Sequence, residues 1–326
     1  MISTAVLVLV VGTILIAVLL PLLRRNQVLD QPGPRSMHEQ PTPRGAGIAL
    51  SVAALAGLSV ARDVPWVLTA GILGFAVLGA LDDLKSQNPK LRIVIQFGLA
   101  IVVAPVIATA GSVSPFTFVL GVVVLVAAVN ATNFMDGING ISGMHAIVWG
   151  VTYFLLLTWS GAEEFAPFAV VLGTIGLTFL PWNFPAARIF LGDSGSYLLG
   201  ALVGLLAVVG LYSGQPLAFL GPLAIYAVDT GGTVLARLRK HESVLEPHRN
   251  HVYQQLGQQG WSHSKIATVT VFFTASVSTL AVWSLHLQGD GLALHIVLAG
   301  MIIALAMTYY RLPALVSRRL SRREES

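Results

Sequence analysis

Cysteine is absent from this chain of 326 residues, and charged side chains make up only 10% of it. Without cysteine there are no disulfides, no thiolate nucleophile and no cysteine-ligated zinc or iron–sulfur site. Soluble domains carry about 25% charged residues, so the scarcity of charge excludes an ordinary soluble protein. Hydrophobic residues instead make up 55% of the chain, and the mean hydropathy is +0.77. These values predict an all-α integral membrane protein.

Apolar runs close to the roughly 20 residues that cross a bilayer as a helix recur along the whole chain. We expect about eleven transmembrane helices, at 2–23, 45–61, 65–81, 92–110, 115–131, 140–159, 166–182, 196–212, 216–234, 265–287 and 291–310. Residues 1–326 are therefore expected to form a single polytopic transmembrane domain.

The distribution of Lys and Arg predicts the orientation of these helices. With the N-terminus outside and the C-terminus in the cytoplasm, only Arg62 of the 19 Lys and Arg residues lies in an outer connection. Cytoplasmic loops of membrane proteins carry such an excess of basic residues. The basic pI near 9.6 is then explained by Lys and Arg side chains that face anionic lipid headgroups or phosphates, and a nucleic-acid partner is not expected.

The inner connections hold the chemically reactive side chains, so we expect one site on the cytoplasmic face. The first of them, LDQPGPRSMHEQPTPRGAG at 29–47, contains Arg44, four prolines and three glycines. This composition is typical of an ordered, non-helical segment or of a plain linker, and both interpretations stay open.

The second inner connection, LDDLKSQNPKLR at 81–92, places Asp82 and Asp83 ahead of Lys85, Lys90 and Arg92. Adjacent carboxylates repel each other unless they share a cation. Oxygen ligands suit Mg²⁺ or Mn²⁺, which indicates a metal site. The alternative is a solvated helix end with acids beside bases.

The third connection lies in NATNFMDGINGISG at 130–143. Asn130, Asn133 and Asp136 are three residues apart, so on a helix they share a face. The glycines that follow Asp136 permit close approach of a ligand or a neighbouring helix to the backbone.

Two further connections carry candidate phosphate-binding groups. In RIFLGDSGS at 188–196, Asp193 lies near a helix start, where backbone N–H groups favour anions; Phe190 either stacks on a base or packs in the core. In the loop at 237–256, His248, Arg249 and His251 suit phosphate oxygens better than zinc.

Together these loops place acids for a metal beside cations for phosphates, which is the combination that phosphoryl transfer requires. In a membrane, at least one substrate is then expected to be a lipid phosphate.

RSMHEQPTPRGAG, the DD pair, NATNFMDGINGISG, FLGDSGS and PHRNH follow one another in this order. In these motifs the chain resembles the polyprenyl-phosphate N-acetylhexosamine-1-phosphate transferases, whose branches include the WecA, MraY and WbpL types. HRNHVYQ is most similar to the WbpL-type O-antigen initiators, because the other two types have a denser histidine cluster.

The resemblance implies transfer of a sugar 1-phosphate from a UDP-N-acetylhexosamine to undecaprenyl phosphate, with Mg²⁺ or Mn²⁺ and release of UMP. It implies a bacterial inner-membrane enzyme that initiates O-antigen or a related cell-envelope polysaccharide, and it leaves a homodimer open.

The resemblance also implies roles for individual residues. Asp193 matches the metal-binding aspartate. Asp82, Asp83, Asp136, His248 and His251 are the candidate catalytic residues, and the candidate substrate-binding residues are Asn133, Asn139, Phe190, Arg44, Lys85, Lys90, Arg92 and Arg249. Asn139 stands where MraY-type members have a second aspartate, so this chain differs from those members at a position that is expected to contact uracil.

Two alternatives differ in class. An intramembrane aspartyl protease would use the GD of LGDSG and the aspartate of YAVD at 226–229, but it leaves the DD pair and the histidine loop unexplained. A secondary transporter would need acids within the bilayer on an alternating path, whereas most acids here lie on one side.

Overall fold

The computed structural model describes residues 1–33, 37, 40–108, 113–243, 248–286 and 291–324, with residues 320–324 described for the backbone only. The predicted cytoplasmic cation Arg35, its neighbours in the motif at 34–39 apart from Met37, and Pro247 of the histidine loop lie outside the described residues.

The described chain is almost entirely helical. Its helices are α1 Ile2–Arg25, α2 Ala46–Ser59, α3 Trp66–Leu84, α4 Pro89–Ile107, α5 Pro115–Met135, α6 Ile141–Ser160, α7 Ala166–Asn183, α8 Gly192–Tyr212, α9 Pro216–Leu220, α10 Ala224–Arg239, α11 Val252–Gln258, α12 His263–His286, α13 Gly291–Tyr310 and α14 Leu312–Glu324. Two 3-10 turns, η1 Glu163–Phe165 and η2 Gly221–Leu223, and an antiparallel pair of two-residue strands, β1 Leu29–Asp30 and β2 Thr42–Pro43, complete it.

Within the described residues, ten helical segments are long and apolar enough to cross a membrane, with α9, η2 and α10 counted as one segment. Each coincides with a predicted apolar run, which confirms an all-α integral membrane protein. The remaining predicted run, 45–61, forms α2, which has only 14 residues. At 1.5 Å per residue α2 is about 21 Å long, which is shorter than the ~30 Å hydrocarbon layer. The orientation of the termini stays a prediction.

The centre of the bundle is α8, whose apolar stretch is completely buried. Neighbouring helices approach it at positions that have no side chain. A Cβ on Gly47 of α2 would lie 2.0 Å from the Gly195 nitrogen, and one on Gly79 of α3 would lie 2.3 Å from the Asp193 carbonyl oxygen. These glycines bring α2 and α3 against the first turn of α8, where Asp193 lies.

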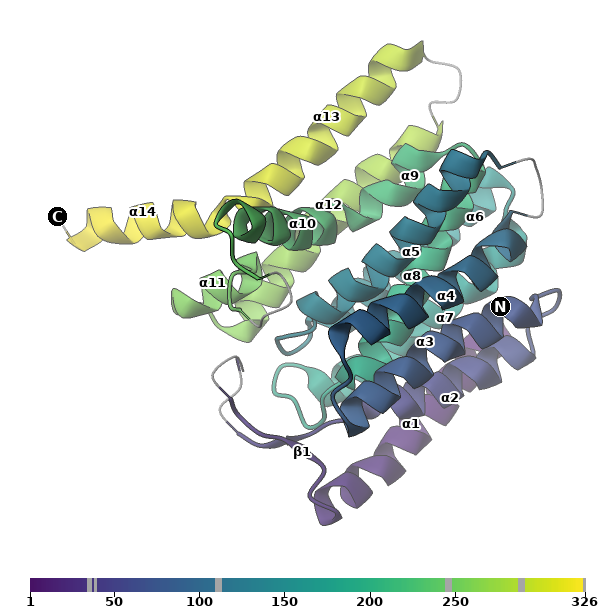
Figure 1. The fold of residues 1–326 in the computed structure, drawn as a ribbon, viewed down its shortest axis with the longest axis horizontal. Coiled ribbons are helices and arrows are strands. Elements are labelled where there is room, and N and C mark those ends of the chain that lie inside the picture. The colour runs from purple at the N-terminus through teal and green to yellow at the C-terminus, as the bar shows by residue number, and fades with distance from the viewer. Residues whose placement is uncertain (34–36, 38–39, 109–112, 244–247, 287–290, 325–326) are drawn as a thin grey trace.

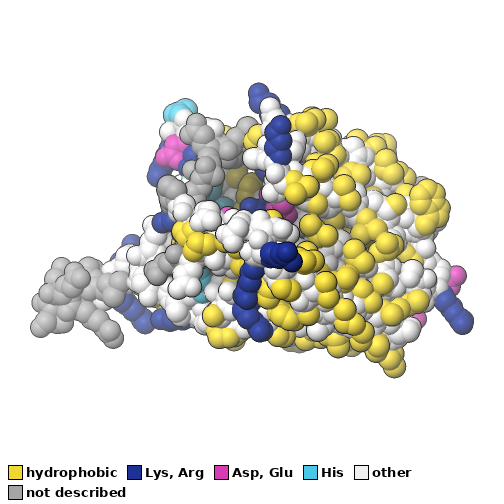
Figure 2. All heavy atoms as spheres, turned by 90° about the horizontal axis from the view of Figure 1, so that it is seen from below, with side chains coloured by type: hydrophobic (Ala, Val, Ile, Leu, Met, Phe, Trp, Pro, Cys, Tyr) yellow, Lys and Arg dark blue, Asp and Glu magenta, His cyan; other side chains and the backbone are white. Residues whose placement is uncertain are grey.

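Polar connections gather at one end of the bundle. Figure 1 shows the β1–β2 pair, α11 and the α5–α6 and α7–α8 connections at the same end, with the N-terminus at the opposite end. In Figure 2 hydrophobic side chains cover most of the right-hand part of the visible surface, whereas many Lys, Arg and His side chains lie to its left or at its edge. Within the first inner connection, Leu29–Asp30 and Thr42–Pro43 pair as β1 and β2, so these described residues are not helical.

Candidate active site

Asp83, near the end of α3, caps the first turn of α8. Its Oδ1 and Oδ2 accept the backbone N–H groups of Asp193 and Ser194 at 2.8 and 3.0 Å. Helix starts leave such N–H groups without intrahelical partners and favour negative charge. Gly192 has a φ of +78°, and a Cβ there would lie 2.7 Å from Asp83 Oδ2. Asp83 and this glycine therefore fix the position of Asp193.

Arg44 joins the carboxylates of Asp83 and Asp193. Its Nη2 donates to Asp193 Oδ1 at 2.7 Å and lies 2.8 Å from Asp83 Oδ1. A parallel bridge to Phe190 holds the Arg44 segment, and the Phe190 carbonyl accepts the N–H of Ala46 at 3.1 Å. Burial disfavours the charged guanidinium, but attraction from Asp193 and Asp83 outweighs this effect and raises the pKa of Arg44.

Asn133, in the last turn of α5, reaches the same carboxylate. Its Nδ2 donates to Asp193 Oδ1 at 2.9 Å and to Ser196 Oγ at 3.0 Å. Asn130, one turn earlier, donates instead to Gln96 Oε1 at 2.6 Å. Of the two asparagines expected on one face, the structure therefore brings only Asn133 to Asp193.

Asp136 follows the last residue of α5. Its Oδ1 accepts a hydrogen bond from Ser142 Oγ near the start of α6. Burial raises the pKa of Asp136 to about 6, although the bond from Ser142 and the charge of Arg44 oppose that rise. Its carboxyl group therefore changes protonation state close to neutral pH.

Asp82 has different partners from its neighbour Asp83. Its Oδ2 pairs with Arg92 Nη1 of α4, and its Oδ1 accepts the Gln87 N–H at 2.6 Å. The two aspartates of the DD pair therefore contact different arginines: Asp83 contacts Arg44, which precedes α2, and Asp82 contacts Arg92 of α4.

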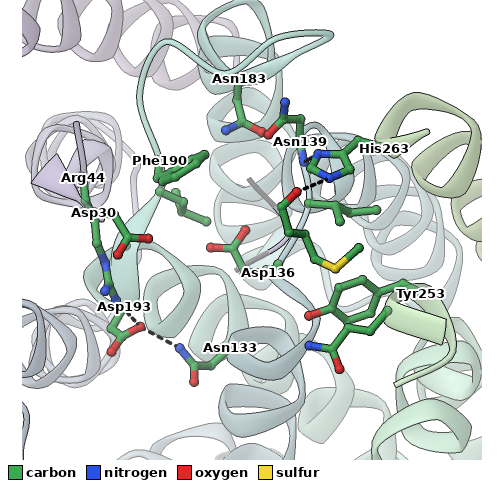
Figure 3. Close-up of a pocket in the computed structure, with 16 residues that line it drawn as sticks. Asp30, Arg44, Asn133, Asp136, Asn139, Asn183, Phe190, Asp193, Tyr253 and His263 are labelled. Atoms are coloured by element: carbon green, nitrogen blue, oxygen red, sulfur yellow. Dashed lines mark hydrogen bonds and ion pairs between the residues drawn. The ribbon is translucent and has the colours of Figure 1, made fainter. Parts of the chain in front are cut away.

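A pocket of about 230 Å³ opens beside these groups. Its lining residues are Asp30, Met37, Arg44, Asn133, Asp136, Gly137, Ile138, Asn139, Asn183, Phe190, Leu191, Gly192, Asp193, Tyr253, Gln254 and His263. Figure 3 shows Arg44, Asp193 and Asn133 on one side and Asn139, Asn183 and His263 on the other, with Asp136 between them. The pocket therefore has a charged side and a side of amide and imidazole groups.

Hydrogen bonds fix the amide side. The Asn139 N–H donates to His263 Nδ1 at 3.4 Å, so His263 Nε2 carries the proton and donates to the Met37 carbonyl at 2.9 Å. Asn183 Oδ1 accepts the Gly140 N–H at 2.6 Å. Sequence reasoning missed Asn183 and His263, because each is a single polar residue beside an apolar run and belongs to no recognisable spacing.

The histidine loop lies beside the pocket wall. His251 is buried, with Nδ1 2.8 Å from Asp229 Oδ1 and its ring centre 5.1 Å from that of His248. Burial and repulsion from His251 lower the pKa of His248. Among the functions predicted from the sequence, only the protease alternative uses Asp229. As an ionisable group within an apolar run, Asp229 is itself a signal for a functional position.

Other predicted substrate-binding cations lie elsewhere. Lys85 and Lys90 are exposed, and Arg249 is half-buried. The described lining of the pocket does not include them, His248 or His251. Their roles stay predictions.

The two aspartates of the protease alternative have separate partners. Asp193 binds Arg44 and Asn133, whereas Asp229 binds His251. An aspartyl protease would need its two carboxyl groups to share a proton.

The chemistry of the site fits a divalent cation. No three or more His, Cys, Asp or Glu side chains in the described part are arranged to hold a metal by themselves. Mg²⁺ needs no such cage, because one or two carboxylates and substrate phosphates suffice. Four aspartates lie here with only two arginines. Arg44 pairs with Asp83 and Asp193, and Arg92 pairs with Asp82. Asp136 bonds to Ser142 instead. This excess of negative charge favours a cation.

Residues 65–211 match the glycosyl transferase family 4 profile. The chain is 26% identical over 303 residues to a probable undecaprenyl-phosphate N-acetylglucosaminyl 1-phosphate transferase of Bacillus subtilis, covering 84% of each chain. It is 26% identical to a decaprenyl-phosphate N-acetylglucosaminephosphotransferase of Mycolicibacterium smegmatis, over 85% of this chain and 80% of that protein. It is 28% identical to a phospho-N-acetylmuramoyl-pentapeptide-transferase of Moorella thermoacetica, over 88% of this chain and 97% of that protein.

Proposed function

We propose that this chain is a membrane phosphotransferase of glycosyl transferase family 4, which transfers an N-acetylhexosamine 1-phosphate from a UDP-sugar to undecaprenyl phosphate and releases UMP. The observation that carries the proposal is the pocket in which Arg44 and Asn133 converge on Asp193 at the start of a buried membrane helix. The relatives' names support it, because each is a polyprenyl-phosphate sugar transferase or a phospho-N-acetylmuramoyl-pentapeptide-transferase.

In this proposal the pocket holds the nucleotide sugar. Arg44 provides positive charge for the diphosphate at the charged side, and Phe190 offers a ring face to uracil. Asn139 contacts the base on the amide side. Asp136 and Asn133 orient the phosphates and the cation, since both line the pocket beside Asp193.

Asp193 is the proposed ligand of Mg²⁺, with Mn²⁺ as the alternative. When bound, the metal would neutralise the charge of the diphosphate. The protein supplies the rest of the charge balance, because Arg44 already contacts Asp193 Oδ1 and Asp83 Oδ1.

The lipid phosphate is proposed to enter at the start of α4, between the exposed Lys90 and the Asp82–Arg92 pair. An oxygen of the lipid phosphate attacks the β-phosphorus of the UDP-sugar. The bond from that phosphorus to the bridging oxygen breaks, and UMP leaves with its electron pair. A two-step route through an aspartyl phosphate ranks second, because the carboxylates of Asp82 and Asp83 are already occupied by hydrogen bonds and arginines.

The proposed setting is the bacterial cytoplasmic membrane, with the site on the cytoplasmic face. The proposed product initiates a lipid-linked glycan, such as O-antigen or another cell-envelope polysaccharide. A homodimer is compatible with this site and is not required for it.

Purified protein in lipid nanodiscs with undecaprenyl phosphate, Mg²⁺ and a panel of UDP-sugars tests the proposal by release of UMP. We expect release with at least one UDP-N-acetylhexosamine, and none when the lipid is omitted. Asp193→Asn should abolish UMP release, whereas Asp63→Asn, at an exposed position in the connection between α2 and α3, should not. Absence of UMP with every sugar would reject the function.

A further inference from the structure

Asp229 lies within α10 and is fully buried. A buried carboxylate costs several kcal/mol unless its oxygens are hydrogen-bonded or paired with a charge. Neither the pocket nor the proposed cation site includes it. Its place in the fold therefore needs another explanation.

Asp229 accepts hydrogen bonds from three residues on two segments, the start of α11 and α13. Oδ1 lies 2.8 Å from His251 Nδ1, and Oδ2 accepts the Tyr309 hydroxyl of α13 at 2.9 Å. The Val252 N–H, at the start of α11, donates to both oxygens at 3.1 and 3.2 Å. An ionised carboxylate only accepts hydrogen bonds, so His251 Nδ1 carries a proton and Nε2 is the ring nitrogen left for a ligand.

Aromatic contacts place this imidazole beside the pocket wall. The His251 ring stacks on Phe134 and on Tyr253, with ring centres 5.9 Å apart in both pairs. Phe134 follows Asn133 in the chain, and its carbonyl accepts the Tyr253 hydroxyl at 3.0 Å. Tyr253 itself lines the pocket. The ring is thus wedged between the end of α5 and the start of α11.

We propose that Asp229 is a positioning residue: it accepts the Nδ1–H of His251 and orients the ring so that a proton on Nε2 is donated to a phosphate oxygen of the nucleotide. The carboxylate also balances the charge of a protonated ring, whose Nε2–H would donate to the leaving phosphate. The identity of this ligand rests on the proposed function, whereas the contact between Asp229 and His251 does not. Tyr309 supports the arrangement from α13, so the last long helix contributes to the site.

Kinetics of the full chain in nanodiscs test whether Asp229 acts through His251. We expect Asp229→Asn to lower kcat about 10–100-fold, as loss of such supporting partners does, with little change in the KM for the lipid. In a His251→Gln background the same change should lower kcat less than about twofold. An equal loss in both backgrounds would overturn the proposal. Asp63→Asn is the matched control.

A milder variant covers the case in which Asp229→Asn does not fold. Tyr309→Phe removes one hydroxyl donor, worth about 1 kcal/mol or roughly a fivefold loss of activity. That loss should also disappear in the His251→Gln background. If it persists there, Tyr309 does not act through His251 and the arrangement is refuted.

A spectroscopic measurement separates this inference from the proposed function. In protein labelled with ¹⁵N-histidine, the signal of a protonated Nδ1 that vanishes in His251→Gln belongs to His251. We expect it in the wild type and expect it to change in Asp229→Asn. If the wild type releases no UMP, the function fails while this measurement still decides the contact. An unprotonated Nδ1 in the wild type would refute the inference.

Discussion

Asp83→Asn distinguishes a structural anchor from a proton acceptor at the DD pair. The resemblance to known transferases makes both aspartates of this pair candidate catalytic residues. In the structure both Asp83 oxygens accept N–H groups of α8, and Oδ1 also contacts Arg44. The substitution keeps the size of the side chain but turns one acceptor into an NH₂ donor that faces an N–H group.

The expected cost follows from these contacts. A lost hydrogen bond to a charged acceptor costs about 1.5–3 kcal/mol, and loss of negative charge at a helix start about 0.3–1 kcal/mol. The ion pair adds at most about 1 kcal/mol, because the Arg44 side chain is 33% exposed. Together these effects predict a loss of about 2–5 kcal/mol in stability. A shift of the α8 start by about 1 Å would also displace Asp193 and lower kcat about 100-fold.

Both quantities are measurable on detergent-purified protein. Thermal unfolding followed by size-exclusion fluorescence reports stability, and UMP release reports kcat. We expect Asp83→Asn to lower both together, while Asp63→Asn lowers neither. If UMP release by Asp83→Asn slows by the full factor of about 100 while the unfolding temperature is unchanged, the anchoring role is refuted and proton transfer by Asp83 is favoured.

Three further predictions concern other parts of the site. Burial raises the pKa of Asp136 to about 6, so its carboxyl group takes up a proton as the pH drops through about 6, and kcat/KM should fall over the same range. Ser142→Ala removes a hydrogen bond that stabilises the carboxylate. The acidic limb of the kcat/KM profile should therefore move to higher pH in this variant. A UMP-release pH profile with an unmoved limb in Ser142→Ala would contradict this. Gly137→Ala should lower the free energy of unfolding by about 1–3 kcal/mol and should also lower activity, because its Cβ would lie 2.1 Å from the Tyr253 hydroxyl. The control in thermal unfolding and UMP assays is Gly98→Ala, where a Cβ meets open space. Chelation with EDTA should abolish UMP release and added Mg²⁺ should restore it in the wild type but not in Asp193→Asn; activity that persists in EDTA would contradict a metal at Asp193.

Much of the fold follows from local patterns along the chain. A run of about 20 apolar residues can satisfy its backbone in lipid only as a helix, so the ten long segments coincide with predicted runs. A helix that crosses the bilayer also sends successive connections to opposite sides. The reactive loops were therefore expected at one end, and Figure 1 shows them there. The length of α2 was not foreseen, because the apolar run continues past the point where the helix ends at Ser59.

The choice of partners within the site did not follow from local patterns. Arg44 and Asp193 are 149 residues apart, and Asp229 and His251 are 22 apart across a loop. Which of two adjacent aspartates meets Arg44, and which of two asparagines on one face meets Asp193, depends on how each helix is rotated about its axis. Such rotation is set by backbone contacts between helices, as where Gly47 meets Gly195.

Residue type and spacing were thus sufficient for the membrane class and the long helices, because these depend on transfer of side chains and backbone between water and lipid. Packing assigned Asp83 to the start of α8, Asp82 to Arg92 and Asp229 to His251. These pairings require the carboxylates to meet donors from distant helices within about 3 Å, a condition that depends on the depth and rotation of whole helices in the bundle.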